Sequence, residues 1–234
     1  MAIEYSVICL SDPEQVRLLE SMNTLRAELS SGEQEELFKR KRPEAISEFL
    51  ATRWAARKLA IKIVPDTKGE NWMVAKQPDG SPFLQSNEGR CLHVSISHKY
   101  PWIAVAVSDL ERVGIDVEKT PLFSSVAQEQ TWIRSIASTG FATQELDSLG
   151  ACNALDLMIR WTQKEAIAKA TSRVGLEGLR MIDTTLIKTG RMQDETQLEW
   201  SDGGNIVLLH SSWLDQQHFM TLAWKSSALS RTKH

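Results

Sequence analysis

The sequence predicts an α+β fold with two similar subdomains arranged as a pseudo-dimer, each a small, mainly antiparallel sheet packed with a long helix. Three observations predict this fold. Helical and strand-like segments are interspersed along the 234 residues, the strands are mostly joined by short turns, and each half contains a long helix and several strands. We expect the subdomains to be residues 1–110 and 111–234, forming one pseudo-twofold unit with the functional site between them.

The first half is expected to begin with a strand and to continue with three helical segments. The strand covers Ile3 to Leu10, and the helices cover Glu14 to Leu29, Glu33 to Arg42 and Glu44 to Ile63. Ser31 lies three residues before Gln34, which is the spacing of an N-terminal helix cap. We therefore expect Ser31 to cap the second of these helices.

The helix over residues 44–63 carries two features on different faces. Its apolar face consists of Ile46, Phe49, Leu50, Trp54, Leu59 and Ile63. Arg53 and Arg57 are four residues apart and share another face. The apolar residues and the two arginines therefore lie on different faces of this helix.

The middle of the chain reads as strands. Leu92 to Ser97 alternates apolar and polar residues, and Trp102 to Ser108 is a continuous apolar run that is typical of a buried strand. Because only a short polar loop follows, we expect Trp102–Ser108 to form a hairpin with Val113–Glu118. The second half is expected to contain helical segments within 121–149, a long helix over 154–170 and four further strands.

Composition and charge exclude several function classes. The net charge of −3 does not favour nucleic-acid binding, and the basic run Lys39-Arg40-Lys41-Arg42 is more often a solvated helix end than a binding patch. Three cysteines without a CxxC pair argue against a disulfide framework or a zinc site. The sequence has neither a basic signal-peptide region nor an apolar run long enough to span a bilayer, so we expect a cytoplasmic protein without membrane contact.

The first candidate site is the segment Val113-Gly114-Ile115-Asp116-Val117-Glu118. On a strand, Asp116 and Glu118 project from one face while the apolar residues project from the other. Two adjacent carboxylates repel each other unless a positive charge lies between them, and a hard cation with oxygen ligands is the simplest one. The alternative is a strand end with two solvated acids.

The second candidate site lies on the helix predicted for 154–170. Glu165 and Lys169 are four residues apart with the acid first, which is the stabilising order. Taken alone, the pair could be a surface ion pair of little energetic consequence. The third candidate is Ser97-His98 at a strand end, where a hydroxyl and an imidazole could hold a phosphate, although such a histidine is more often structural or exposed.

In this order, the segments SISH, GIDVE and WTQKEAIAKA resemble the 4′-phosphopantetheinyl transferase superfamily. The length and the two predicted subdomains are similar to its larger, surfactin-type group, whose members act as monomers. The resemblance implies an enzyme that transfers the 4′-phosphopantetheine arm of coenzyme A to a serine of an apo acyl or peptidyl carrier protein and releases 3′,5′-ADP. It implies a role in fatty acid, polyketide or nonribosomal peptide biosynthesis and a need for Mg²⁺, with Mn²⁺ as a substitute.

The resemblance also implies a role for individual residues. Asp116, Glu118 and Glu165 match the metal ligands, with Glu165 as the alternative base. Lys169 matches the lysine that neutralises the coenzyme A phosphates, so Asp116, Glu165 and Lys169 form the implied catalytic set. Ser97 and His98 match contacts of the adenosine 3′-phosphate. Arg53 or Arg57 matches, more loosely, basic residues that bind coenzyme A.

Two parts of the sequence depart from the family pattern or leave it open. Ser81 stands where the family usually has a basic residue between a glycine and a proline, which removes one expected phosphate contact. Glu145 matches an acid of an F-x-x-x-E segment near the site, within a stretch (124–149) where carrier contacts are expected. A relative that binds coenzyme A or a carrier protein without turnover, and an unrelated metal-dependent phosphohydrolase, remain the alternatives.

Overall fold

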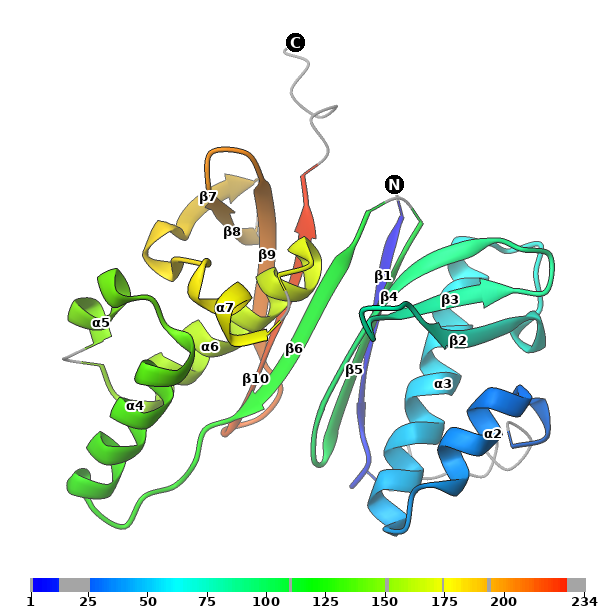
Figure 1. Cartoon of the computed structure of the whole chain (residues 1–234), viewed down its shortest axis with the longest axis horizontal. Coiled ribbons are helices and arrows are strands. Elements are labelled where there is room, and N and C mark those ends of the chain that lie inside the picture. The colour runs from blue at the N-terminus through cyan, green and yellow to red at the C-terminus, as the bar shows by residue number, and fades with distance from the viewer. Residues whose placement is uncertain are drawn as a thin grey trace. The chain divides into compact units, whose positions relative to one another are not determined.

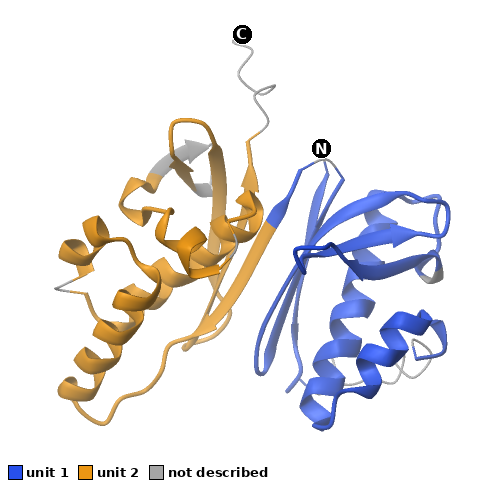
Figure 2. Cartoon of the chain, viewed as in Figure 1, with its two compact units in different colours: residues 1–113 blue, residues 114–234 orange. Residues whose placement is uncertain are grey.

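The computed structural model describes residues 2–12, 26–109, 111–149, 152–173, 175–192 and 195–226. Within it the chain divides into two compact units, Met1–Val113 and Gly114–His234 (Figure 2). Most of the helix predicted for residues 14–29 lies outside the described residues. No helix in the described part combines the length and the apolar character needed to cross a bilayer.

Unit 1 is a five-stranded sheet with one long helix on it (Figure 1). Its elements are β1 (Ile3–Cys9), α2 (Ser31–Phe38), α3 (Pro43–Ile63), η1 (Gly69–Asn71), β2 (Trp72–Lys76), β3 (Pro82–Ser86), β4 (Cys91–Lys99) and β5 (Trp102–Ser108). The strand order is β1-β5-β4-β3-β2. Helix α3 contacts β1, β2, β4 and β5, and its apolar face forms the core of the unit with residues such as Leu84, Ile103 and Val105.

Unit 2 repeats this plan. Its elements are β6 (Val113–Lys119), α4 (Val126–Gly140), α5 (Thr143–Leu149), α6 (Ala154–Thr171), α7 (Gly175–Arg180), η2 (Thr184–Leu186), β7 (Lys188–Met192), β8 (Glu195–Ser201), β9 (Ile206–Trp213) and β10 (His218–Lys225). The strand order is β6-β10-β9-β8-β7, and the long helix α6 packs on β10 and β9. In both units the first strand lies beside the last one, which confirms the predicted α+β fold with two similar sheet-and-helix subdomains.

The predicted hairpin between residues 102–108 and 113–118 is wrong. Strand β5 pairs with β4 through Ile96↔Val105 and with β1 through Val7↔Ala104, so both of its edges are occupied within unit 1. Strand β6 instead takes the edge of the second sheet beside β10. A short connection between two strand-like segments favours a hairpin, but the edge of β5 is occupied by the amino-terminal strand β1, which is far away in sequence.

The predicted cap of α2 is one residue off. Ser30, not Ser31, accepts a hydrogen bond from the backbone N–H of Glu33, and the Glu33 carboxylate accepts one from the backbone N–H of Ser30. This reciprocal pair is a capping box. Strands β2 and β3 were not predicted at all, because the turn residues between them dominate the short segment.

Glu33 is also the centre of a buried polar network in unit 1. Its Oε2 lies 2.7 Å from Nη2 of Arg57, and its Oε1 accepts the backbone N–H of Val74 at 3.1 Å. Arg57 Nε donates to the carbonyl of Trp72 at 2.7 Å. Both charged side chains are almost fully buried, 2% and 3% exposed. The network therefore joins α2, α3 and β2 inside the unit.

Replacing Glu33 by Gln should destabilise unit 1 strongly, because Arg57 would keep its charge in the interior without a counter-charge. We expect a loss of about 3–5 kcal/mol in the free energy of unfolding, measured by urea denaturation. Glu36→Gln is the matched control, because Glu36 pairs with Lys39 at the surface of the same helix. The control should change stability by less than about 1 kcal/mol. Equal effects of the two variants would contradict the structural role of Glu33.

Candidate active site

Strand β6 presents its acidic residues on the side that faces α6. Gly114, Asp116 and Glu118 alternate with Val113, Ile115 and Val117, as the strand period requires. The three apolar side chains are almost fully buried, and Asp116 is 5% exposed although it is charged. Asp116 is therefore held inside the fold, unlike the solvated acid of the alternative interpretation.

Gly114 determines how closely α6 can approach β6. A Cβ atom built on Gly114 would lie 1.9 Å from the carbonyl oxygen of Ala166 and 2.8 Å from the nitrogen of Ala170. No side chain fits such a gap, since both obstacles are helix backbone. The helix therefore crosses the strand with backbone almost in contact, and residues on either side of Ala166 are brought next to Asp116.

The closest charged contact at this crossing joins the two elements. Lys169 Nζ donates to Asp116 Oδ1 at 2.7 Å and to the carbonyl of Ile115 at 2.9 Å. The sequence left open a surface pair between Lys169 and Glu165. In the structure Lys169 is bonded across to the strand, while 30% of its side chain stays exposed. The ammonium group is thus fixed in position and still reachable from solvent.

Glu165 is the unneutralised carboxylate of the group. In the described part of the chain it makes no hydrogen bond and no ion pair. Burial raises its pKa, the neighbouring Asp116 raises it further, Lys169 lowers it in part, and Glu118 raises it again. A partly buried carboxylate with an elevated pKa is suited to accept a proton near neutral pH.

Asp116, Glu118 and Glu165 are the candidate site for a hard cation. Their oxygen donors have the chemistry that Mg²⁺ prefers, and the raised pKa of Glu165 in the field of Asp116 and Glu118 indicates that a cation would be favoured there. Among the residues that the structure describes, however, no three such side chains stand together as a ready-made metal cluster. Asp116 is also paired with the Lys169 ammonium group. The carboxylate oxygens are nevertheless of the type that binds Mg²⁺.

Lys164 and Glu145 belong to the scaffold of unit 2. Lys164 Nζ lies 2.7 Å from Glu145 Oε2 and donates to the carbonyls of Leu179 and Ile182. The other Glu145 oxygen accepts the backbone N–H and the hydroxyl of Thr184, at 2.8 and 2.6 Å. Both charged side chains are 0% exposed. Glu145 is therefore not an extra acid near the site, because its carboxylate is used to join α5, α6 and η2.

Helix α4 also packs closely against α6, at Gly140. A Cβ on Gly140 would lie 2.5 Å from Cζ3 of Trp161, whose ring also packs against Phe141 with centroids 6.0 Å apart. Trp161, the first residue of the helical motif, thus serves packing. Two residues of the motif, Trp161 and Lys164, therefore stabilise the fold, and two others, Glu165 and Lys169, belong to the candidate site.

The Ser97-His98 pair lies at the end of β4 in unit 1. Ser97 is mostly buried, whereas the His98 ring is 54% exposed. Glu48 of α3, which the sequence analysis did not select, places its Oε2 3.6 Å from His98 Nδ1. The imidazole therefore has a carboxylate beside it and a face open to solvent.

The two arginines of α3 differ in availability. Arg57 is committed to the buried network with Glu33 and Trp72, which makes it a structural residue. Arg53 is 12% exposed; burial lowers its pKa to about 10, Glu33 opposes that effect, and Arg40 and Arg57 add to it. Its guanidinium lies 3.9 Å from the centre of the Phe49 ring, with Arg40 also over that ring at 4.2 Å. Arg53 is therefore the better candidate for an anionic ligand.

Ser81 is bound within its own turn. Its backbone N–H and hydroxyl donate to Asp79 Oδ1, at 2.9 and 2.5 Å. A cation is nevertheless close, since Arg112 lies 3.8 Å from Asp79 Oδ2 and donates to Gln77. No local pattern in the sequence points to Arg112, because 35 residues separate it from Gln77.

A model of the 4′-phosphopantetheinyl transferase superfamily matches residues 112–220. The matched range contains β6, α6 and the four charged residues of their crossing. Over this range the chain is similar to the 4′-phosphopantetheinyl transferase superfamily. Its two units, each with a five-stranded sheet and a long helix, agree with the two-subdomain, surfactin-type group of that superfamily.

Among curated proteins, the chain is similar to the L-aminoadipate-semialdehyde dehydrogenase-phosphopantetheinyl transferase of Xenopus laevis. The two sequences are 26% identical over 202 aligned residues. The match covers 77% of this chain and 66% of the frog protein's length. It therefore extends well beyond the range of the family model and into unit 1.

Replacing Gly114 by Ala should push α6 away from β6. Because the clash is with backbone, we expect a loss of about 1–3 kcal/mol or more in the free energy of unfolding, measured by urea denaturation. Gly204→Ala is the matched control, since nothing lies within 4 Å of a Cβ there. It should change stability by no more than about 0.5 kcal/mol. A Gly114 variant as stable as the control would contradict the close crossing.

Proposed function

We propose that this chain transfers the 4′-phosphopantetheine arm of coenzyme A to a serine of an apo acyl or peptidyl carrier protein. One observation supports the proposal most strongly. The crossing of β6 and α6 holds a fixed ammonium group, Lys169, beside a partly buried carboxylate, Glu165, whose pKa is raised. Phosphoryl transfer needs such a pair, because negative charge must be neutralised while a hydroxyl loses its proton.

In the proposed reaction, Glu165 accepts the proton of the carrier serine. The serine oxygen forms a bond to the phosphorus that bears the pantetheine, and the bond from this phosphorus to the bridging oxygen breaks. The bridging oxygen leaves with 3′,5′-ADP. Lys169 stabilises the negative charge on the phosphates during transfer, and its two bonds to β6 keep it in place without reorganisation.

The other residue roles are those that the resemblance implies, except where a side chain is already bonded within the protein. Asp116 and Glu118 would hold Mg²⁺ or Mn²⁺, which would supply further neutralisation of the phosphate oxygens; Glu165 would be the third ligand if it is not the base. His98 and Ser97 would bind the adenosine 3′-phosphate, and Arg53 would contribute a cation. We leave Arg57 out of the binding set, because it is already bonded to Glu33 and Trp72.

Two alternatives compete with this function. A binder of coenzyme A or a carrier protein without turnover would have no use for an unneutralised carboxylate such as Glu165. A metal-dependent phosphohydrolase could use the same acids but would give water, not a carrier, access to the phosphorus. The fate of the phosphopantetheine arm separates all three.

Intact-mass spectrometry of carrier proteins tests the proposal. The panel includes apo acyl and peptidyl carriers and the carrier domain of an L-aminoadipate-semialdehyde dehydrogenase, the acceptor suggested by the name of the frog relative. Each is incubated with the chain, coenzyme A and Mg²⁺, with and without chelator. We expect a metal-dependent gain of one phosphopantetheine. Degraded coenzyme A with unmodified carriers would indicate the hydrolase, and intact coenzyme A with unmodified carriers the binder.

Replacing Glu165 by Gln should remove the base while the fold persists. We expect kcat to fall by a factor on the order of 10²–10⁴ in the carrier assay. Because Glu165 makes no hydrogen bond in the described residues, melting temperature should stay within a few degrees. Glu177→Gln is the control, an exposed acid on α7. Wild-type turnover of the Glu165 variant would reject its role.

Replacing Lys169 by Ala should mainly weaken the use of coenzyme A, because one phosphate contact is lost. A hydrogen bond between charged groups is worth enough to raise the apparent KM for coenzyme A roughly tenfold or more. Lys188→Ala, an exposed lysine at the start of β7, serves as the control. An unchanged KM and rate in the Lys169 variant would exclude the phosphate contact.

A further inference from the structure

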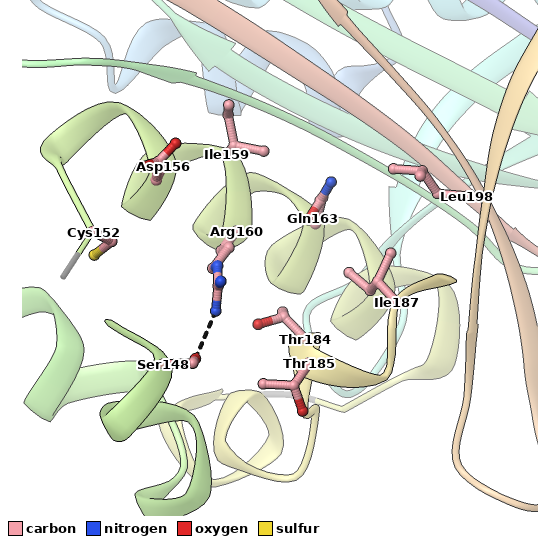
Figure 3. A pocket seen from close by; sticks show the side chains of 10 residues that line it. All are labelled: Ser148, Cys152, Asp156, Ile159, Arg160, Gln163, Thr184, Thr185, Ile187 and Leu198. Atoms are coloured by element: carbon pink, nitrogen blue, oxygen red, sulfur yellow. Dashed lines mark hydrogen bonds between the residues drawn. The ribbon is translucent and has the colours of Figure 1, made fainter. Parts of the chain in front are cut away.

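Unit 2 contains a pocket that the proposed reaction does not use. Its volume is about 650 Å³, within the range of small-molecule sites. The wall is formed by α6 together with α5, η2 and β8 (Figure 3). The lining residues that matter most are Ser148, Ile159, Arg160, Gln163, Ile187 and Leu198.

The pocket lies on a different side of α6 from the candidate active site. Gln163 and Glu165 are two positions apart, which corresponds to about 200° around a helix with 3.6 residues per turn. Gln163 lines the pocket, while Glu165 shares the electrostatic environment of Asp116 and Lys169. A ligand in the pocket would therefore not occupy the position of the phosphates.

The hydroxyl groups at one end of the pocket already donate hydrogen bonds to other protein groups. Ser148 donates to the carbonyl of Glu145, Thr184 donates to the Glu145 carboxylate, and Thr185 donates to Asp183. These oxygens can now only accept. Any donor for an anionic ligand must come from the cation of the pocket or from an amide.

Arg160 supplies that cation. Its Nη1 donates to Ser148 Oγ at 2.8 Å, which is the only hydrogen bond of this side chain within the described ranges. The planar guanidinium has five N–H groups, so it retains donors for a carboxylate. Asp156 also lines the pocket, but Figure 3 shows the Arg160 side chain directed toward Ser148 and away from Asp156.

Gln163 gives an independent indication of a ligand. Only 7% of this residue is exposed, and it makes no hydrogen bond to any residue that the structure describes. Its amide atoms are not among the enclosed, unpartnered side-chain atoms of the described residues, so the amide reaches the open space of the pocket. The Gln163 amide lies along the pocket between Ile159 and Ile187, where a molecule in the pocket can pair with it in place of water (Figure 3).

We propose that this pocket binds a small organic carboxylate whose chain carries an amide and ends in an aliphatic segment. The carboxylate pairs with Arg160, and the amide of the ligand pairs with Gln163. The aliphatic segment covers Ile187 and Leu198. This order follows Figure 3, in which Gln163 lies between Arg160 on one side and Ile187 and Leu198 on the other.

N-hexanoylglycine is a suitable probe, because it places a carboxylate, an amide and an alkyl chain in that order. Titration into the ¹⁵N-labelled full chain should give saturable shifts of the Gln163 side-chain amide and of Arg160 Nε–H. N-hexanoylglycinamide lacks the charge and hexanoate lacks the amide, so both should bind more weakly. Equal binding of the neutral amide would overturn the role of Arg160.

Variants test the same assignment without relying on the probe series. Arg160→Gln and Gln163→Leu should each weaken N-hexanoylglycine binding roughly tenfold or more. Arg134→Gln on the exposed side of α4 is the matched control and should leave binding unchanged. Absence of saturable binding to the wild-type chain at millimolar probe, or unchanged affinity in both pocket variants, would refute the proposal. The wild-type shifts of Gln163 remain decisive even where a variant folds poorly.

Discussion

The close crossing of α6 over β6 at Gly114 is the constraint on which the candidate site depends. Because a glycine removes the only side chain at the contact, helix backbone reaches strand backbone and carries Lys169 to within 2.7 Å of Asp116. The same approach places Glu165 in the field of two carboxylates, which raises its pKa together with burial. A small residue at one position thus produces a fixed cation and an unneutralised base.

Each unit anchors its long helix in the same way. In unit 1, α3 contributes the buried Arg57 to Glu33 of the preceding helix α2; in unit 2, α6 contributes the buried Lys164 to Glu145 of the preceding helix α5. Each carboxylate also accepts a backbone N–H from a later segment. Buried ion pairs add little net stability over apolar packing, but breaking one leaves an uncompensated charge. The long helices are therefore fixed in register, and α6 also carries the candidate site residues.

The sequence was most informative where a local pattern decides the structure. The long helices and the alternation of Gly114, Asp116 and Glu118 follow from periodicity, and the order of three short motifs was enough to indicate the family. Contacts between distant segments could not be read in this way. The pairing of β5 with β1, the separate functions of Arg53 and Arg57, and the scaffold role of Glu145 all depend on partners from 19 to about 100 residues away. Adjacent motif residues such as Lys164 and Glu165 look equivalent in sequence and differ only once the helix is packed.

The central claim is that Asp116, Glu118 and Glu165 form one functional centre with Lys169. A crystal structure of the chain with coenzyme A and Mn²⁺, with anomalous diffraction used to locate the metal, tests it most directly. The account predicts an anomalous peak bonded to oxygens of these carboxylates, with a phosphate oxygen of coenzyme A within hydrogen-bond distance of Lys169 Nζ. A peak at other residues, or phosphates bound away from Lys169, would contradict it.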